Sequence, residues 1–119
     1  MPRKVVFYRN ARGEKPAGEF LKSLSMEARQ KCVAYLRRLA EEGPNLPANI
    51  AARVVDDLWE LRPEWGGTEH RFFYFFLIED TIYVVPAVTK KRHRTKDTDI
   101  EVAQTRVAEL RALYAAGKL

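Results

Sequence analysis

The sequence predicts a single α+β domain, in which an antiparallel sheet is covered by helices. The predicted elements follow the order β-α-α-β-β-β-α, and no helix separates the last three strands as it would in a parallel sheet. The chain has 119 residues, which is enough for one domain over 1–119. Its longest apolar run, 72–78, is too short to cross a membrane and suits a buried strand.

The N-terminal part is predicted to form a short strand and two helices. Residues 3–8 are rich in β-branched and aromatic side chains, which favours a strand. Pro16 suits the first turn of a helix. Ser25 can cap a second helix, which is expected to end at Gly43-Pro44. The predicted core stripe of this second helix consists of Val33, Leu36, Leu39 and Ala40.

Three strands and a final helix are predicted after a loop over 44–53. The strands are expected at 58–62, 69–79 and 82–88, separated by turn residues at 64–68 and 80–81. A capping pattern opens the last helix, because Thr98 is followed three residues later by Glu101. One face of that helix carries Ile100, Ala103, Val107, Leu110 and Tyr114.

The residue composition excludes several classes of protein. A single cysteine, Cys32, rules out an internal disulfide framework, and its place in a helical apolar pattern indicates a core residue. The two histidines, His70 and His93, do not have zinc-ligand spacing, and we find no phosphate-binding glycine loop or nucleophile elbow. No signal peptide or membrane span is recognisable. We therefore expect a cytoplasmic protein without a metal or another cofactor.

The strongest local signal is a basic segment, 90–96, between the last strand and the last helix. Five of its seven residues are basic and one is histidine, in a chain of net charge +5. Loops held by a rigid sheet often carry catalytic groups, although a solvated run of charge would have the same composition. The segment suits a polyanionic partner such as a nucleic acid.

Two arginines in the predicted strands are further candidates for a functional site. Alternation of side chains places Arg62 on the face opposite Trp59, whose own face is expected to be covered by helices. Arg71 lies in an almost wholly apolar strand, where a guanidinium needs a partner. It could form a structural ion pair with Glu60 or Glu69, or clamp a phosphate on the open face of the sheet.

These residue types are compatible with cleavage of RNA without a metal. The 2′-OH of RNA can itself attack the neighbouring phosphate, so a protein needs to orient the groups, stabilise negative charge and assist proton transfer. Arginine holds phosphate oxygens through its planar fork, and histidine can move protons near neutral pH.

Three segments occur in a characteristic order before the amphipathic C-terminal helix: Leu58-Trp59-Glu60-Leu61-Arg62, then Gly66-Gly67-Thr68-Glu69-His70-Arg71-Phe72-Phe73-Tyr74-Phe75, then Val88-Thr89-Lys90-Lys91. This series resembles the RelE/ParE superfamily of toxins, and most closely its HigB-type, phage-derived branch. The resemblance covers nearly the whole chain and is strongest over 57–110. It implies a RelE-like (microRNase-type) fold, with an antiparallel sheet packed by an N-terminal helical hairpin and a C-terminal helix.

The resemblance also implies a function. Such proteins are toxins of type II toxin–antitoxin systems, and many are metal-independent endoribonucleases that cleave mRNA on the ribosome and inhibit translation. A helix-turn-helix antitoxin would neutralise the toxin and bind their operator DNA. Arg62, Arg71 and Lys91 match the basic active-site positions of the family, and His93 is the nearest candidate for an acid or stacking group. The residues expected to grip the RNA backbone are Lys90, Arg92, Arg94 and Lys96.

The sequence departs from the family pattern at two places. Glu60 stands where RelE-type members tend to have a basic residue, and Lys96 and Asp97 stand where they carry a tyrosine, which Tyr74 or Tyr83 could replace. The superfamily also contains ParE-like toxins that inhibit gyrase by binding it, and fold alone does not fix function. The alternatives are thus a ParE-like inhibitor and a non-catalytic module that binds an antitoxin or a nucleic acid.

Overall fold

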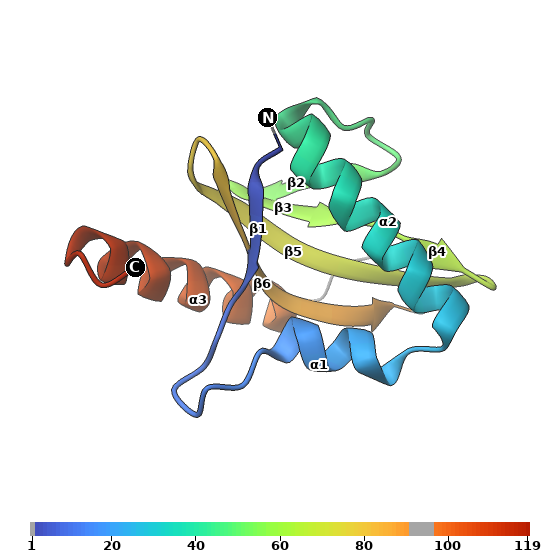
Figure 1. The fold of residues 1–119 in the computed structure, drawn as a ribbon, viewed down its shortest axis with the longest axis horizontal. Coiled ribbons are helices and arrows are strands. Elements are labelled where there is room, and N and C mark those ends of the chain that lie inside the picture. Colours follow the sequence, from blue (N-terminus) through green and yellow to red (C-terminus); the bar gives the residue numbers. More distant parts are fainter. Residues whose placement is uncertain (1, 91–96) are drawn as a thin grey trace.

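A computed structural model of the protein describes residues 2–90 and 97–119, with only the backbone described at 87–90. The described residues form an α+β fold, as the sequence predicts (Figure 1). Its elements are β1 (Lys4–Phe7), α1 (Pro16–Ser23), α2 (Met26–Glu42), a 3-10 turn (Gly43–Asn45), β2 (Ala51–Val55), β3 (Leu58–Leu61), β4 (Glu64–Trp65), β5 (Thr68–Ile78), β6 (Thr81–Lys90) and α3 (Asp97–Ala115).

The strands form one mixed sheet. Their order in space is β1-β6-β5-β3-β2, and the short β4 pairs with β5. β1 runs parallel to β6, whereas the other paired strands are antiparallel. The prediction of a wholly antiparallel sheet is therefore wrong. Strands next to each other in a parallel pair need a long connection, and the segment from α1 to β5 supplies it between β1 and β6.

Two strands were not expected. β2 begins at Ala51, inside the predicted loop over 44–53, and forms an edge of the sheet against β3. β4 occupies the start of the predicted turn at 64–68 and pairs with the start of β5. Between them, Gly66 and Gly67 have φ angles of 59° and 78°, a left-handed conformation that glycine adopts at little cost.

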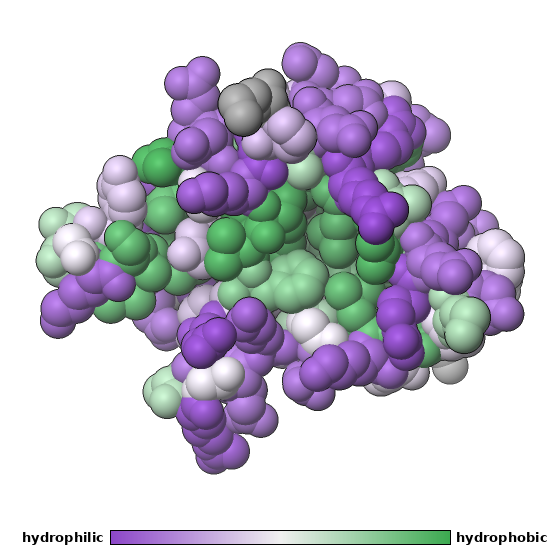
Figure 2. Space-filling model, in the orientation of Figure 1, coloured by the Kyte–Doolittle hydropathy of each residue, from purple (hydrophilic) through white to green (hydrophobic). Residues whose placement is uncertain are grey.

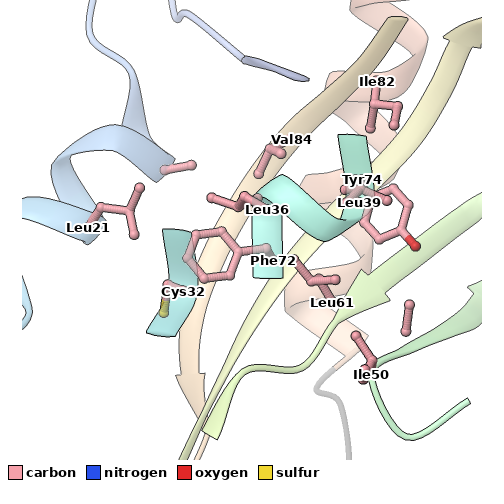
Figure 3. Close-up of a cluster of buried hydrophobic side chains, with 12 residues drawn as sticks. Leu21, Cys32, Leu36, Leu39, Ile50, Leu61, Phe72, Tyr74, Ile82 and Val84 are labelled. Carbon is pink, nitrogen blue, oxygen red and sulfur yellow. The ribbon is translucent and has the colours of Figure 1, made fainter. Parts of the chain in front are cut away.

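Each face of the sheet has its own apolar layer, because successive side chains of a strand point to opposite faces. Phe72 and Tyr74 of β5 lie in the layer under α1 and α2, where Figure 3 shows them beside Leu36 and Leu39. Phe73 and Phe75 lie in the other layer, with buried residues of α3. The side chains of Leu61 and Trp59 join the layer under α1 and α2, as predicted for that face of β3.

α1 and α2 cover their face of the sheet incompletely. They meet at their connection and spread apart across the strands (Figure 1). Figure 2, in the same orientation, shows apolar side chains gathered between them within a hydrophilic rim. The partly buried apolar residues of this layer include Val5, Phe7, Phe20 and Leu24.

α2 begins and ends where the sequence predicts. The Ser25 side chain accepts a hydrogen bond from the Ala28 N–H at 3.2 Å, and Gly43 follows the last turn with a φ of 55°. The buried face differs slightly from the predicted stripe, because Val33 and Ala40 are only partly buried. The buried residues of α2 are Ala28, Cys32, Leu36 and Leu39.

α3 packs on the opposite face of the sheet through Ala103, Val107 and Leu110, which are buried as predicted. Tyr114 is 45% exposed, contrary to prediction, because the last turns of α3 extend past the sheet (Figure 1). The helix already begins at Asp97, so Thr98 lies within its first turn and the predicted cap is wrong. In the described ranges, no helix is long and apolar enough to cross a membrane.

We expect the thiol of Cys32 to be unreactive in the native protein. Cys32 is fully buried, and burial raises the pKa of its thiol to about 11, so the reactive thiolate is scarce at about pH 8. A disulfide reagent such as DTNB should label no thiol under native conditions and one per chain in denaturant. Rapid stoichiometric labelling of the native protein would contradict this position of Cys32.

Candidate functional site

Four charged side chains form a continuous charged row, Glu69–Arg71–Glu60–Arg62. Arg71 Nη2 lies 2.7 Å from Glu69 Oε1, and Arg71 Nη1 lies 2.8 Å from Glu60 Oε1. Arg62 Nη2 lies 2.7 Å from the same oxygen of Glu60. Positive and negative groups alternate along the row, so its formal charges cancel.

The register of β3 against β5 brings the charged row together. Glu60 lies opposite Phe73, so Arg71 is its diagonal neighbour, two residues along β5. Residues two apart share a face of the sheet, and Arg71 therefore lies on the same face as Phe73, which belongs to the layer that α3 covers. Arg62 follows directly after β3 on the face predicted for it, opposite Trp59.

The two central members of the charged row are buried. Glu60 and Arg71 are each 2% exposed. A buried charge is costly without a partner, and each of these groups contacts an opposite charge. Of the two roles left open for Arg71, the structure shows the ion pair, with Glu60 and Glu69 together. Arg71 does not lie on an open face, so a phosphate could reach it directly only after a rearrangement.

Arg62 is the arginine of the charged row that reaches solvent, with a side chain 34% exposed. Its Nε donates to Glu60 Oε1 at 2.9 Å, and its Nη2 lies 2.7 Å from the same oxygen. This contact uses one edge of a guanidinium that carries five N–H donors, so the opposite edge remains directed away from Glu60. The backbone N–H of Arg62 donates to the carbonyl of Ile50 at 2.8 Å, which fixes the end of β3 against the start of β2.

The backbone of β6 ends beside the charged row. Lys90 lies opposite Glu69 in the pairing of β6 with β5, and Val88 lies opposite Arg71. β6 thus extends two residues past its predicted end. The other predicted site residues of the basic segment lie outside the described residues: Lys91, Arg92, His93, Arg94 and Lys96.

A β-bulge precedes this end of β6. Phe72 pairs with Ala87 and Tyr74 pairs with Val84, so Val85 and Pro86 together lie opposite a single residue, Phe73. Proline lacks a backbone N–H and is tolerated within a sheet at such irregularities. The bulge therefore accommodates Pro86. It also shifts the register of β6 against β5 by one residue before β6 reaches the charged row.

His70 and Tyr74 lie on the face of β5 opposite the charged row. The ring of His70 packs edge-on against Phe20 with centroids 5.7 Å apart, and burial lowers the pKa of His70. Tyr74 is 1% exposed, and burial raises the pKa of its phenol. Tyr74 is therefore a core residue. Tyr83 stacks on Phe75 in the layer under α3, with ring centroids 6.3 Å apart.

A polar cluster that no sequence pattern indicates joins α3 to Tyr8, which directly follows β1. The Tyr8 hydroxyl donates to Glu109 Oε2 at 2.7 Å, which raises the pKa of Tyr8. The Arg106 guanidinium lies 4.8 Å from the centre of the Tyr8 ring and donates to the carbonyl of Val85 at 2.8 Å. A surface hollow of about 490 Å³ adjoins these side chains. About a hundred residues separate the partners, so no local pattern signals their contact.

The described carboxylates of the charged row are engaged by arginine. Among residues 2–90 and 97–119, no group of three or more His, Cys, Asp or Glu side chains is arranged to hold a metal ion. Glu60 and Glu69 each contact an arginine instead. Arg62 supplies the most accessible positive group of the row.

Comparison with known proteins identifies a family. Residues 19–108 match the model of the family described as phage derived protein Gp49-like (DUF891). The matched region spans three quarters of the chain, including all four members of the charged row. No curated protein matches the chain.

We expect Arg71→Ala to destabilise the protein strongly. The substitution leaves the Glu60 and Glu69 carboxylates without the guanidinium between them, and breaking a buried pair typically costs about 3–5 kcal/mol. Arg62→Ala should cost much less, because Glu60 keeps Arg71 as a partner. Urea unfolding of both variants measures the two costs. A loss below about 1 kcal/mol for Arg71→Ala, the range of surface pairs, would contradict its burial.

We also expect stability to fall as the pH decreases from about 7.5 to about 5.5. The pKa of His70 in the folded protein lies below its usual value of 6.5. In this window the unfolded chain binds more protons than the folded chain, so the free energy of unfolding decreases as the pH falls. His70→Phe keeps an aromatic ring beside Phe20 but cannot titrate, and it should flatten this slope in urea titrations at several pH values. An equal slope in both proteins would show that other groups cause it.

Proposed function

Because the chain belongs to the Gp49-like family of phage-derived proteins, part of the RelE/toxin-like superfamily, we propose that it is the toxin of a type II toxin–antitoxin system. Its proposed activity is that of a HigB-type endoribonuclease, which cleaves mRNA on the ribosome in the cytoplasm and thereby inhibits translation. The proposed neutralising partner is a helix-turn-helix antitoxin, through which the complex would bind operator DNA.

The observation that carries the proposal is the placement of Arg62. Its guanidinium is partly exposed, is held along one edge by a buried carboxylate, and stands at the end of a strand. Lys90 is the first residue of the basic segment. In the backbone pairing of β6 with β5 it lies opposite Glu69, at the other end of the charged row. A fixed arginine at one end of the row, with a strongly basic segment that begins at the other end, is an arrangement suited to a phosphate of RNA.

In the proposed reaction, the 2′-oxygen of a ribose attacks the adjacent phosphorus and the bond from phosphorus to the 5′-oxygen breaks. The products are a 2′,3′-cyclic phosphate and a free 5′-OH, so one proton leaves the 2′-OH and one reaches the 5′-oxygen. Arg62 would hold the non-bridging oxygens and Lys91 would stabilise the added negative charge. His93 would transfer a proton or stack on a base. The roles of Lys91 and His93 are inferred from the sequence alone, because these two residues lie outside the described residues.

The remaining basic residues would hold the RNA backbone. Lys90, Arg92, Arg94 and Lys96 would contact phosphates, so binding should weaken as salt rises. Arg71 would act on the reaction through its buried contact with Glu60, which in turn holds Arg62. The ribosome would supply the reactive geometry of the mRNA that this small set of groups cannot impose alone.

We predict that Arg62→Ala suppresses toxicity. Loss of one preorganised donor to a developing charge typically lowers a rate by about 100- to 1,000-fold. Wild-type protein, Arg62→Ala and the control Arg37→Ala, an exposed position on α2, would be induced in cells. Mapping of the 5′ ends of cellular mRNA should reveal new cuts, in phase with codons, for wild type and Arg37→Ala only.

Two other results would contradict this scheme in different ways. Equal cutting by Arg62→Ala and wild type would remove Arg62 from the active site. Intact mRNA together with a DNA-damage response would instead support a ParE-like inhibitor of gyrase, and growth without either effect would support a non-catalytic binding module.

A further inference from the structure

We propose that Glu60 is a positioning residue, which holds Arg62 with its outer edge ready for a phosphate of RNA. The inference rests on the proposed function, because it takes Arg62 to be the group that contacts the scissile phosphate. It concerns the position at which the sequence departs from RelE-type members, where a buried carboxylate replaces a basic side chain.

The contacts of a single oxygen carry this inference. Glu60 Oε1 accepts hydrogen bonds from Arg62 Nε at 2.9 Å and Arg71 Nη1 at 2.8 Å, and it lies 2.7 Å from Arg62 Nη2. Two adjacent nitrogens of Arg62 on one acceptor fix the direction in which its guanidinium points. A long side chain fixed before binding loses less conformational entropy when it holds a phosphate.

The rest of the charged row immobilises Glu60 itself. Its carboxylate is buried and cannot turn to solvent without leaving Arg71 behind in the core. Arg71 is anchored in turn, because its Nη1 contacts Glu60 while its Nη2 contacts Glu69. The row is thus a rigid support that begins inside the sheet and ends at the partly exposed Arg62.

A competing role for Glu60 is that of an internal anion that occupies the phosphate position and must be displaced by RNA. The geometry disfavours this role, because a phosphate in place of a side chain that is almost wholly buried would have to enter the core beside Arg71. The two roles predict opposite effects of removing the charge. Positioning predicts slower cleavage, whereas displacement predicts tighter binding of RNA and faster cleavage.

A double-mutant cycle in Glu60 and Arg62 tests the positioning role. Glu60→Gln keeps the shape and one acceptor oxygen but removes the charge. For RNA cleavage by the purified protein with ribosomes, we expect Glu60→Gln to lower kcat by about 10-fold and to change KM little, since a small misplacement of a reacting group is costly. In the Arg62→Ala background, where the supported group is absent, Glu60→Gln should cause no further loss of kcat.

The matched control is Glu42→Gln. Glu42 also pairs with an arginine, Arg38 on α2, but at the surface, with Arg38 Nε 2.7 Å from Glu42 Oε2. This pair lies on another element, and its substitution should leave kcat and KM at their wild-type values. Thermal melting of each variant shows that the compared proteins are folded.

Arg62→Lys is a second variant that leaves the buried part of the row intact. Lysine keeps the positive charge. Its compact ammonium has no planar fork, so it cannot contact Glu60 with one edge and a phosphate with the opposite edge as a guanidinium can. We expect kcat of Arg62→Lys to fall nearly as far as that of Arg62→Ala. Wild-type kcat in Arg62→Lys would overturn the proposal.

A readout without catalysis separates this inference from the proposed function. The Arg62 Nε–H should give a slowly exchanging NMR signal that shifts or disappears in Glu60→Gln, whether or not the protein cleaves RNA. An unaltered signal would overturn the positioning role, as would tighter RNA binding by Glu60→Gln or an equal loss of kcat in both backgrounds. Absence of RNA cleavage by the wild-type protein, with the signal behaving as expected, would overturn the proposed function instead.

Discussion

A buried pair of opposite charges, Glu60 with Arg71, constrains the rest of this structure. Neither group is stable in an apolar layer without the other, so β3 and β5 must keep the register that places them diagonally. A slip of one residue in β3 would turn Glu60 towards α1 and α2 and move Leu61 to the opposite face. The pair therefore helps to fix the register of β3, and with it the position of Arg62 directly after this strand.

The two faces of the sheet differ in the side chains that they carry. The face under α1 and α2 holds the aromatic core, including His70 and Tyr74, whose pKa values burial shifts away from proton transfer near neutral pH. The other face holds a second apolar layer under α3, and the charged row lies on this same face. Apolar packing on both sides gives β5 the rigidity that a precisely placed charged group needs. The family match covers β5 and all four members of the charged row.

Local patterns in the sequence determine much of the fold. The α+β class, the Ser25 cap and strands β3, β5 and β6 follow from hydrophobic periodicity and turn residues. The parallel pairing of β1 with β6 could not be predicted this way, because strand direction depends on the path of the connection between them. At the site, strand parity gave the correct face for Arg62. It could not decide between the two roles of Arg71, because burial depends on which elements cover that face.

The charged row also limits how this protein can change by mutation. Loss of Glu60 alone leaves Arg71 with only Glu69, and loss of Arg71 alone leaves Glu60 with only Arg62, so replacing either position by itself passes through a less stable intermediate. Selection for stability is thus expected to preserve the charged row in descendants of this protein, even where selection for activity is relaxed. Related sequences should fall into two groups, which keep both residues or have exchanged both, and the boundary between the groups would mark a rare coordinated replacement in the history of the family.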